Sequence, residues 1–396
     1  MSHRQNADEI EEAASRWIWP SGSPSSCGPA EHEPVRLAII GTGLIGASAG
    51  LAARRAGVGE VVGWDDDPNA LDVAVEREAV ARAESLPDAL AGADVALVAI
   101  PVAGLPAVVR SVLDVASDGC TVTDVGSTKG AVCAAAGSDA RFVGGHPICG
   151  AETRGPERAT ADLFAGATWF LTPVSSVEPE HYRTVHGLVS ALGARAVAIE
   201  PDAHDRLVAV TSHLPHALAN VLLNHAGAAR IEGHDPLAAA GGSLRDMTRI
   251  AGANPRIWVD ILLENREALA AALAEHRRRI EQLEAALADG DAGFLARWIG
   301  EASGNRRRML DTAYEDAGAL QRVRVHVPDR PGVLAGIFHA LGAERINVSD
   351  FDLEHLSPER GGTLTILVTG EASATLAADL LGAQGYGVVV APVLEE

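Results

Sequence analysis

Four short polar segments of the sequence combine residue types that could bind and deprotonate a small anionic molecule. They are DVGSTK (124–129), GHPICGAE (145–152), SHLPH (212–216) and RDMTR (245–249). A neutral imidazole accepts a proton near neutral pH, so the histidines are candidate bases. A guanidinium can bind a carboxylate through two parallel hydrogen bonds, so the arginines are candidate anchors for an acid. Together these are residue types that could act as a base and bind an acid.

The charge of the 396-residue chain restricts the partners of such a site. Its formal net charge is −21, which argues against nucleic acid as a partner, because nucleic acid requires a basic face. The same charge repels anionic ligands, so an anion site has to be a local concentration of positive charge. Lys129 is the only lysine among the 32 basic residues, and arginine supplies the rest of the positive charge.

Composition and cysteine spacing predict a cytoplasmic globular protein. Hydrophobic residues make up 47% of the chain, and no apolar run reaches the roughly 18 residues of a membrane span. The N-terminus lacks the charged-then-apolar pattern of a secretion signal. The four cysteines form neither a close pair nor a metal-type spacing. We therefore expect reduced thiols, no metal site and no membrane contact.

A glycine-rich segment, GTGLIG (41–46), predicts a dinucleotide-binding loop. It follows an apolar run directly and opens an Ala-rich helical stretch, so a pyrophosphate would meet free N–H groups at a helix N-terminus. Asp65 ends the next apolar run, where a carboxylate suits the ribose hydroxyls and repels an added phosphate. This arrangement favours NAD over NADP. The predicted cofactor residues are Gly41, Thr42, Gly43, Leu44, Ile45, Gly46 and Asp65.

The elements that have to position these segments follow from the apolar runs. VRLAIIG, EVVGWDD, DVALVAIPV, CTVTDVGS and RFVGGHPI lack alternation, as strands buried on both faces do, and helical stretches separate them. ATWFLTPV and ARAVAIEP extend the set. We expect a polar, disordered tail over residues 1–34. A doubly wound parallel sheet, the α/β Rossmann arrangement, should follow over residues 35–200. The carboxyl ends of its strands face the ligand crevice, so the first two polar segments should border the nicotinamide.

The remaining chain predicts two further units. Strand signals are missing from residues 201–316, where an apolar helical stripe indicates an all-α substrate and dimerisation domain. Its members are Leu269, Leu273, Ile280, Leu283 and Leu287. Residues 320–396 read strand, helix, strand, strand, helix, strand, which is the ferredoxin-like α+β order. A homodimer is the expected assembly.

The four polar segments, in this order behind the glycine loop, resemble those of prephenate dehydrogenases. The resemblance covers about residues 35–314 and implies oxidative decarboxylation of prephenate to 4-hydroxyphenylpyruvate with hydride transfer to NAD. It implies that His146 is the catalytic histidine, that Ser127 is the serine beside it, and that Arg249 binds the substrate. Further substrate-site candidates are His213, His216, Glu152, Asp246 and Lys129.

Plainer interpretations of these residues stay open. Ser127 could be an ordinary helix cap, and the two histidines of the third segment could be satisfied core residues. Asp246 and Glu152 could form a surface pair. Lys129 could reach either a phosphate or the substrate.

The C-terminal segment resembles the amino-acid-binding regulatory domains known as ACT domains. The resemblance rests on VPDRPGVL (327–334) followed by INV (346–348). It implies an effector site at the turn before the first helix, where a helix N-terminus suits a carboxylate. The predicted effector is L-tyrosine. The predicted regulatory residues are Asp329, Pro331, Gly332, Val333 and Asn347.

Several other functions stay open on the residues alone. Arogenate dehydrogenase is the nearest alternative, because arogenate differs from prephenate by an ammonium in place of a keto group. A hydroxyacid dehydrogenase or imine reductase would share the two-domain plan and the Gly-Ser loop. A non-catalytic NAD-binding sensor would not need His146 and Arg249 together.

Overall fold

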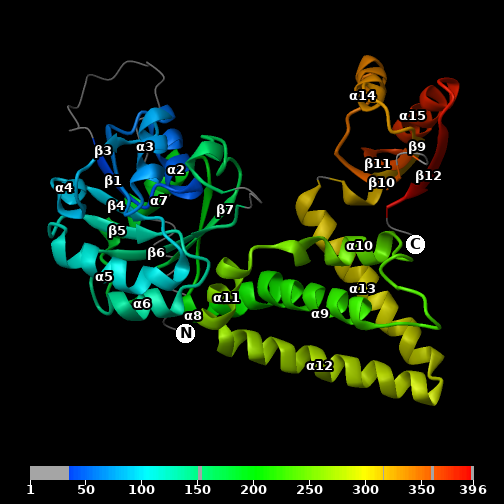
Figure 1. Ribbon diagram of the computed structural model, residues 1–396, viewed down its shortest axis with the longest axis horizontal. Coiled ribbons are helices and arrows are strands. Elements are labelled where there is room, and N and C mark those ends of the chain that lie inside the picture. Colours follow the sequence, from blue (N-terminus) through cyan, green and yellow to red (C-terminus); the bar gives the residue numbers. More distant parts are fainter. Residues whose placement is uncertain (1–34, 150–153, 315, 358–360, 394–396) are drawn as a thin grey trace. The chain divides into compact units, whose positions relative to one another are not determined.

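The computed structural model describes residues 35–149, 154–314, 316–357 and 361–393 (Figure 1). The predicted tail, residues 1–34, lies outside the described residues. The chain divides into two compact units, one ending at His276 and one running from Arg277 to Glu396. Among the described residues, no helix combines the length and the apolar character needed to cross a bilayer.

The first unit contains an eight-stranded sheet of order β3-β2-β1-β4-β5-β6-β7-β8. Its strands are β1 (Arg36–Ile40), β2 (Glu60–Trp64), β3 (Ala81–Arg82), β4 (Val95–Val98), β5 (Thr121–Asp124), β6 (Phe142–Pro147), β7 (Thr168–Thr172) and β8 (Arg195–Ala198). The order reverses between β1 and β4, which is the switch point at which doubly wound sheets bind ligands. The predicted Rossmann sheet is confirmed.

The direction of the last two strands differs from the all-parallel expectation. β7 pairs antiparallel with β6, and β8 then runs parallel to β7. A parallel neighbour requires a crossover connection, usually a helix. In its described part, the chain between β6 and β7 has only the short 3₁₀ turn η2 (Pro156–Arg158). The chain therefore returns along the sheet in the opposite direction.

Helices cover both faces of the sheet (Figure 1). They are α2 (Leu44–Arg55), α3 (Pro68–Glu76), α4 (Leu86–Leu90), α5 (Leu105–Val115), α6 (Gly130–Ala136) and α7 (Pro179–Ala191). Successive residues of β1 contribute to two different cores: Leu37 and Ile39 pack with α2, α3 and α7, whereas Ala38 and Ile40 pack with α4, α5 and α6. Burial on both faces explains why these strands lack hydrophobic alternation in the sequence.

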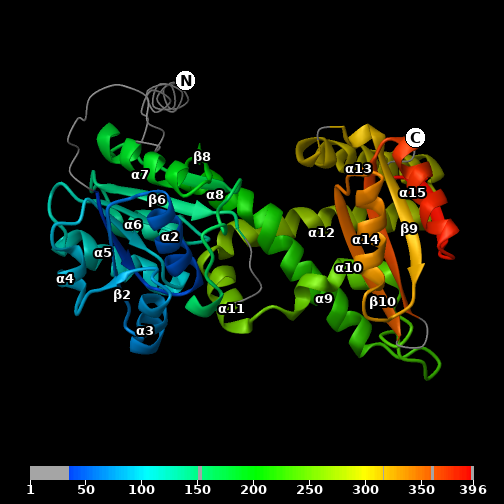
Figure 2. The same cartoon turned by 90° about the horizontal axis from the view of Figure 1, so that it is seen from above.

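Residues 201–313 are helical in their described part. The helices are α8 (Pro201–Val208), η3 (Ala209–His213), α9 (Leu214–Ala228), α10 (Gly242–Thr248), η4 (Arg249–Gly252), α11 (Pro255–Glu264), α12 (Arg266–Asp289) and α13 (Ala292–Ala313). η3 is a π-helical turn through which α8 continues into α9 (Figure 2). The predicted apolar stripe lies on α12 as expected. Leu269 is buried, but Ile280 and Leu287 are 44% and 61% exposed in the single chain.

The C-terminal segment forms a four-stranded antiparallel sheet of order β10-β11-β9-β12 covered by two helices. Its elements are β9 (Leu320–Val327), α14 (Val333–Ala343), β10 (Asp350–Ser357), β11 (Gly361–Thr369), α15 (Glu371–Ala383) and β12 (Gly387–Pro392). A closed apolar core, including Val325, Ile337 and Ile366, lies between helices and sheet. The ferredoxin-like order is confirmed. The second strand begins at Asp350, four residues later than predicted, because Ile346 turns into the core first.

Candidate active site

The glycine loop has the geometry of a dinucleotide cradle. Gly41 has φ +94°, and a Cβ there would lie 2.5 Å from the carbonyl oxygen of Ala99. A Cβ on Gly46 would collide with the carbonyl oxygen of Gly41, so helix and strand pack at the closest possible distance. A Cβ on Gly43, by contrast, would meet no described heavy atom within 4 Å. The backbone at Gly43 is therefore uncovered, so a pyrophosphate can approach the N-terminus of α2 there.

Asp65 is fixed beside this loop. Its Oδ2 accepts hydrogen bonds from the backbone N–H of Thr42 at 2.5 Å and from the Thr42 hydroxyl at 3.1 Å. Its Oδ1 accepts from the N–H of Asp67 at 2.9 Å. A half-buried carboxylate at the end of β2 suits ribose hydroxyls as donors and disfavours a phosphate. The residues present therefore fit NAD.

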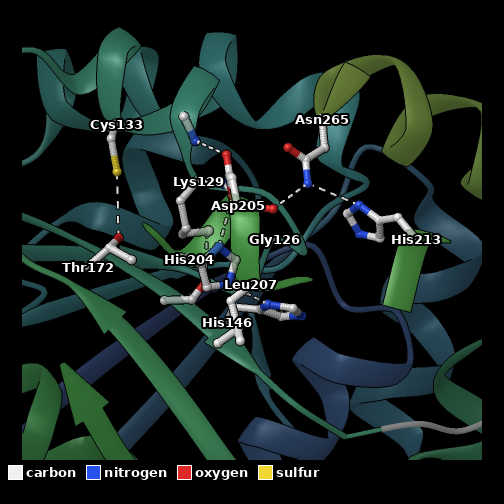
Figure 3. Close-up of polar contacts among 12 residues, drawn as sticks. Gly126, Lys129, Cys133, His146, Thr172, His204, Asp205, Leu207, His213 and Asn265 are labelled. Atoms are coloured by element: carbon white, nitrogen blue, oxygen red, sulfur yellow. Dashed lines mark hydrogen bonds and ion pairs between the residues drawn. The ribbon is translucent and has the colours of Figure 1, made fainter. Parts of the chain in front are cut away.

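A chain of hydrogen bonds runs from His146, near the end of β6, to the middle of α8 (Figure 3). His146 Nδ1 lies 2.9 Å from His204 Nε2, and His204 Nδ1 lies 2.9 Å from Asp205 Oδ1. Asp205 also accepts from the backbone N–H groups of Lys129 and Gly130, each at 2.8 Å. Burial alone would raise the pKa of Asp205, but these hydrogen bonds together hold it below its usual value. Asp205 is thus a fixed anion.

That anion determines the proton positions along the chain. A carboxylate only accepts, so His204 must carry its proton on Nδ1. A neutral His204 then accepts at Nε2, and His146 donates to it from Nδ1. The Nε2 of His146 is left with a free lone pair. Burial lowers the pKa of His146 well below its ordinary value, and the neighbouring His204 adds to the effect. His146 is therefore a neutral base at neutral pH.

Lys129 occupies a different position from the one predicted. Its side chain is completely buried, forms an ion pair with Asp124 and donates to the carbonyl oxygen of Gly145 at 2.7 Å. Asp124 in turn accepts from the N–H groups of Gly126 and Gly145, at 2.8 and 3.0 Å. The prediction of a contact with substrate or phosphate does not fit this placement. The ion pair instead joins the loop after β5 to the residue that precedes His146.

The histidines of the third segment both face inward from the junction of η3 and α9. The side-chain Nδ2 of Asn265 donates hydrogen bonds to His213 Nδ1 at 3.0 Å and to the backbone carbonyl oxygen of Asp205 at 2.8 Å. Burial lowers the pKa of His213 to about 4. His216 stacks on the Trp258 ring, with centroids 3.5 Å apart, and its buried Nδ1 has no hydrogen-bond partner in the described structure. Burial lowers the pKa of His216 as well.

The structure also places three more of the predicted site residues. Ser127 is half-buried in the loop between β5 and α6. Arg249 and Asp246 are both exposed, at the end of α10 and the start of η4. Glu152 lies outside the described residues. Sequence reasoning missed His204, Asp205, Asn265 and Trp258, which the fold brings to the same place as His146, His213 and His216.

The predicted regulatory residues lie at the two ends of α14, four of them at its N-terminus and Asn347 beyond its C-terminus. Gly332, at the N-terminus of α14, has φ +87°, a left-handed conformation that favours glycine. Asp329 and Pro331 precede it in an exposed turn, and Val333 opens the helix half-buried. Asn347 is exposed between α14 and β10.

Comparisons with known proteins agree with this architecture in each of its three regions. Residues 49–198 match "Prephenate dehydrogenase, nucleotide-binding domain", residues 200–301 match "Prephenate dehydrogenase, dimerization domain", and residues 321–383 match "ACT domain". The prephenate dehydrogenase of Bacillus subtilis is 30% identical over 342 residues, covering 83% of this chain and 91% of that protein. The chain belongs to the prephenate dehydrogenase family.

Two solved structures of related dehydrogenases share the fold of the first two domains. Prephenate dehydrogenase from Aquifex aeolicus, in complex with hydroxyphenyl propionate and NAD⁺, has a TM-score of 0.66 at 28% identity, covering 70% of this chain and 99% of that one. Synechocystis arogenate dehydrogenase has a TM-score of 0.63 at 27% identity, covering 69% and 99%. The family resemblance predicted from the polar segments is confirmed, and so is the C-terminal ACT domain. The chain is an NAD-dependent dehydrogenase of this family.

The contacts of Asp65 give a direct test of cofactor choice. Asp65→Ser removes the carboxylate that suits ribose hydroxyls and repels a ribose phosphate, so the preference for NAD over NADP should fall by about tenfold, or about 1.4 kcal/mol. The ratio of kcat/KM for the two cofactors measures the effect. Asp66→Ser is a matched control, because Asp66 is exposed beside it. A native enzyme with a higher kcat/KM for NADP than for NAD would show that the carboxylate at the end of β2 does not select NAD.

Proposed function

We propose that the chain catalyses the oxidative decarboxylation of prephenate to 4-hydroxyphenylpyruvate, a step of tyrosine biosynthesis. The observation that carries the proposal is the half-buried, neutral His146, whose ring is held by His204 and Asp205 so that Nε2 can accept a proton. The B. subtilis relative is a prephenate dehydrogenase, and the A. aeolicus structure pairs NAD⁺ with a hydroxyphenyl acid.

The mechanism assigns one task to each group. NAD, when bound at Gly41–Gly46 and Asp65, supplies the hydride acceptor. His146 Nε2 accepts the proton of the ring hydroxyl as that carbon becomes carbonyl-like. Ser127, in the loop joined to the His146 strand through Lys129 and Asp124, is proposed to share the hydroxyl. Loss of carbon dioxide then makes the ring aromatic.

Substrate binding is proposed for the helical side of the site. His216 offers a buried Nδ1 that has no partner in the described structure, next to the flat face of Trp258. An unpaired buried nitrogen is costly unless a ligand satisfies it. His213 completes this wall, with its proton on Nε2 because Nδ1 accepts from Asn265. Arg249 is proposed to bind a substrate carboxylate, with Asp246 and Glu152 as ionic neighbours.

Arg249→Ala should therefore weaken substrate use without affecting NAD binding. Loss of a hydrogen bond to a charged group costs about 1.5–3 kcal/mol, which corresponds to roughly ten- to a hundredfold in kcat/KM for prephenate. Arg256→Ala, which removes an exposed arginine from α11, is the matched control. An unchanged kcat/KM in the Arg249 variant would exclude a role in substrate binding.

Prephenate and arogenate are distinguished by direct competition. Arogenate carries an ammonium in its side chain, and the Synechocystis neighbour is an arogenate dehydrogenase. Among the described groups whose charges act on His146 and His213, the carboxylate is Asp205, which already accepts from His204 and two backbone N–H groups. This setting supports the keto acid. The ratio of kcat/KM for the two substrates, measured with the full-length chain, tests the assignment, and a ratio in favour of arogenate would reverse it.

A homodimer is proposed on the apolar surface of the helical region. Residues 200–301 match the family's dimerization domain. Exposed apolar side chains continue along its helices, a pattern that marks protein–protein contact. They include Val259 and Leu263 in the first unit and, separately, Ile280 and Leu287 in the second. Analytical ultracentrifugation should give twice the chain mass of 41.0 kDa.

The ACT domain is proposed to confer feedback inhibition, with L-tyrosine as effector. Asp329, Pro331, Gly332 and Val333 form the turn at the N-terminus of α14, where backbone N–H groups can receive an amino acid's carboxylate. Asn347, in the exposed connection at the opposite end of α14, is proposed as a separate contact for an effector.

Truncation distinguishes inhibition through the ACT domain from inhibition at the active site. Removing residues from Gly318 onward should preserve dehydrogenase activity, because the ACT domain has its own core. Couplings of about 1–3 kcal/mol predict a loss of roughly 5- to 150-fold in tyrosine potency. In the full-length chain, Asn347→Ala should weaken inhibition in the same direction. Inhibition that survives truncation would assign tyrosine to the active site.

A further inference from the structure

The hydrogen-bond chain behind His146 passes through a histidine that solvent does not reach. His204 is completely buried, and its outer nitrogen meets Asp205, whose side chain is 13% exposed. The two carboxylate oxygens of Asp205 also accept from the backbone N–H groups of Lys129 and Gly130. In the described structure, a proton that moves from His146 to His204 therefore stays inside the protein, next to a fixed carboxylate.

The proposed reaction requires a group that takes up one proton and later returns it. The ring hydroxyl loses its proton to His146 while the hydride leaves the same carbon. Carbon dioxide then departs, its bonding electron pair enters the ring, and the same oxygen becomes a phenolate. That oxygen recovers a proton to give the phenol. One prephenate and one NAD⁺ thus yield 4-hydroxyphenylpyruvate, carbon dioxide and NADH, with no net proton released or consumed. The proton has only to be held and returned.

We propose that His204 is the group that holds this proton between the two halves of the reaction. As His146 Nε2 takes the hydroxyl proton, its Nδ1 proton passes over 2.9 Å to His204 Nε2. His204 becomes an imidazolium whose Nδ1–H remains bonded to Asp205. The reverse transfer returns the proton through His146 to the phenolate oxygen. The inference rests on the proposed function, and in this role His204 positions and relays without touching the substrate.

The two rings differ in their contacts with charged groups. His204 contacts the Asp205 carboxylate directly, so a proton passed to this ring arrives beside an anion. His146 has no carboxylate contact in the described structure, and burial opposes its charged form. The other ionisable groups around the pair are the Lys129–Asp124 ion pair and His213, which burial keeps neutral. Lys129 and His213 both disfavour a charge on His146.

His204→Gln tests the relay, because glutamine can still accept from His146 Nδ1 but cannot hold a proton. The single-turnover rate of NADH formation should fall by about a hundredfold, the lower end of the range for lost acid–base catalysis. KM for prephenate and the NAD dissociation constant should change little. His181→Gln is the matched control: His181 is another buried histidine with one hydrogen bond, to Thr121 at 2.7 Å, and lies outside the site.

Two readouts separate a relay from a merely structural role. In mixtures of H₂O and D₂O, the native single-turnover rate should depend on deuterium content with the curvature of two moving protons. The His204→Gln rate should depend on it linearly. ¹⁵N-histidine NMR of the resting native enzyme, with His204→Gln and His146→Asn for assignment, should place the protons of both rings on Nδ1.

Any one of three results would overturn the relay. The first is a single-turnover rate of His204→Gln above half the native value. The others are an unchanged isotope curvature in that variant and a proton on His146 Nε2 at neutral pH. Failure of the proposed function would look different. The native enzyme would then oxidise no cyclohexadienyl substrate, whereas the NMR measurement still decides the proton positions on which the relay depends.

Discussion

Replacement of His146 by asparagine is expected to lower kcat with prephenate by about 10²–10⁴-fold, the usual cost of losing a positioned base. Asparagine keeps a polar group of similar size beside His204 but cannot accept the hydroxyl proton. The affinity for NAD should hardly change, because the glycine loop and Asp65 lie on other strands. Steady-state kinetics and NAD titration measure the two quantities. A variant that keeps more than about a tenth of native turnover would remove His146 from the mechanism.

The pH dependence supplies an independent check on the same residue. Burial lowers the pKa of His146 well below 6.5, so its neutral form persists as the pH falls through the range in which an ordinary histidine becomes protonated. Activity that depends on the base is therefore full at neutral pH and is lost only below that ordinary value. In a profile of kcat/KM, the acid limb should have its midpoint below 6.5. A midpoint at or above 6.5 would contradict the burial of the base.

Lys129→Met is expected to reduce the free energy of unfolding by about 3–5 kcal/mol, because it leaves Asp124 buried with its charge unpaired. The loss should be larger than for an ordinary surface lysine, since the ammonium also binds the carbonyl oxygen of Gly145. Urea unfolding monitored by circular dichroism measures the change. Arg110→Met is the matched control, because Arg110 forms an exposed ion pair with Asp114 and its loss should leave stability nearly unchanged.

The same variant also distinguishes the two interpretations of the only lysine. A large loss of stability, with whatever activity remains in the folded fraction, supports the structural ion pair. Stability close to native combined with a raised KM for prephenate or NAD would instead restore the contact with substrate or phosphate that the sequence suggested.

Local pattern was enough to predict the cofactor loop and the fold. Gly41, Gly43 and Gly46 each have the environment that their spacing implies: a left-handed turn, an open approach and a close packing contact. The apolar runs marked the buried strands because both faces of the sheet are covered. The C-terminal order of strands and helices was likewise readable, because each element is short and bounded by turn residues.

The long-range part of the site was not predictable from one sequence. His146 and His204 are 58 positions apart, and nothing in the segment PDAHD (201–205) distinguishes a buried relay from an ordinary helix start. The sequence likewise gives no signal for Asn265 and Trp258, which join the site only when α11 packs beside η3 and α9. Lys129 was misplaced for a related reason. Its partners Asp124 and Gly145 become neighbours only when β5 and β6 pair, so its uniqueness in the sequence suggested a ligand where the fold makes an internal ion pair.

The reversed direction of β7 shows how a connection can decide topology. The sequence predicted a strand at ATWFLTPV correctly, but a strand pattern is the same in either direction. The stretch between β6 and β7 lacks a helical period in its described part, and without a crossover helix the strand has to return antiparallel.

The most direct test of the proposed function is the stoichiometry of the reaction with prephenate. Purified full-length enzyme, NAD and prephenate labelled with ¹³C in the ring carboxyl group should give NADH and labelled carbon dioxide in equal amounts. No change in proton concentration should accompany the reaction once carbon dioxide hydration is accounted for. The organic product should be 4-hydroxyphenylpyruvate. NADH formed from simple hydroxyacids but from neither prephenate nor arogenate, or NADH formed without carbon dioxide, would contradict the proposal.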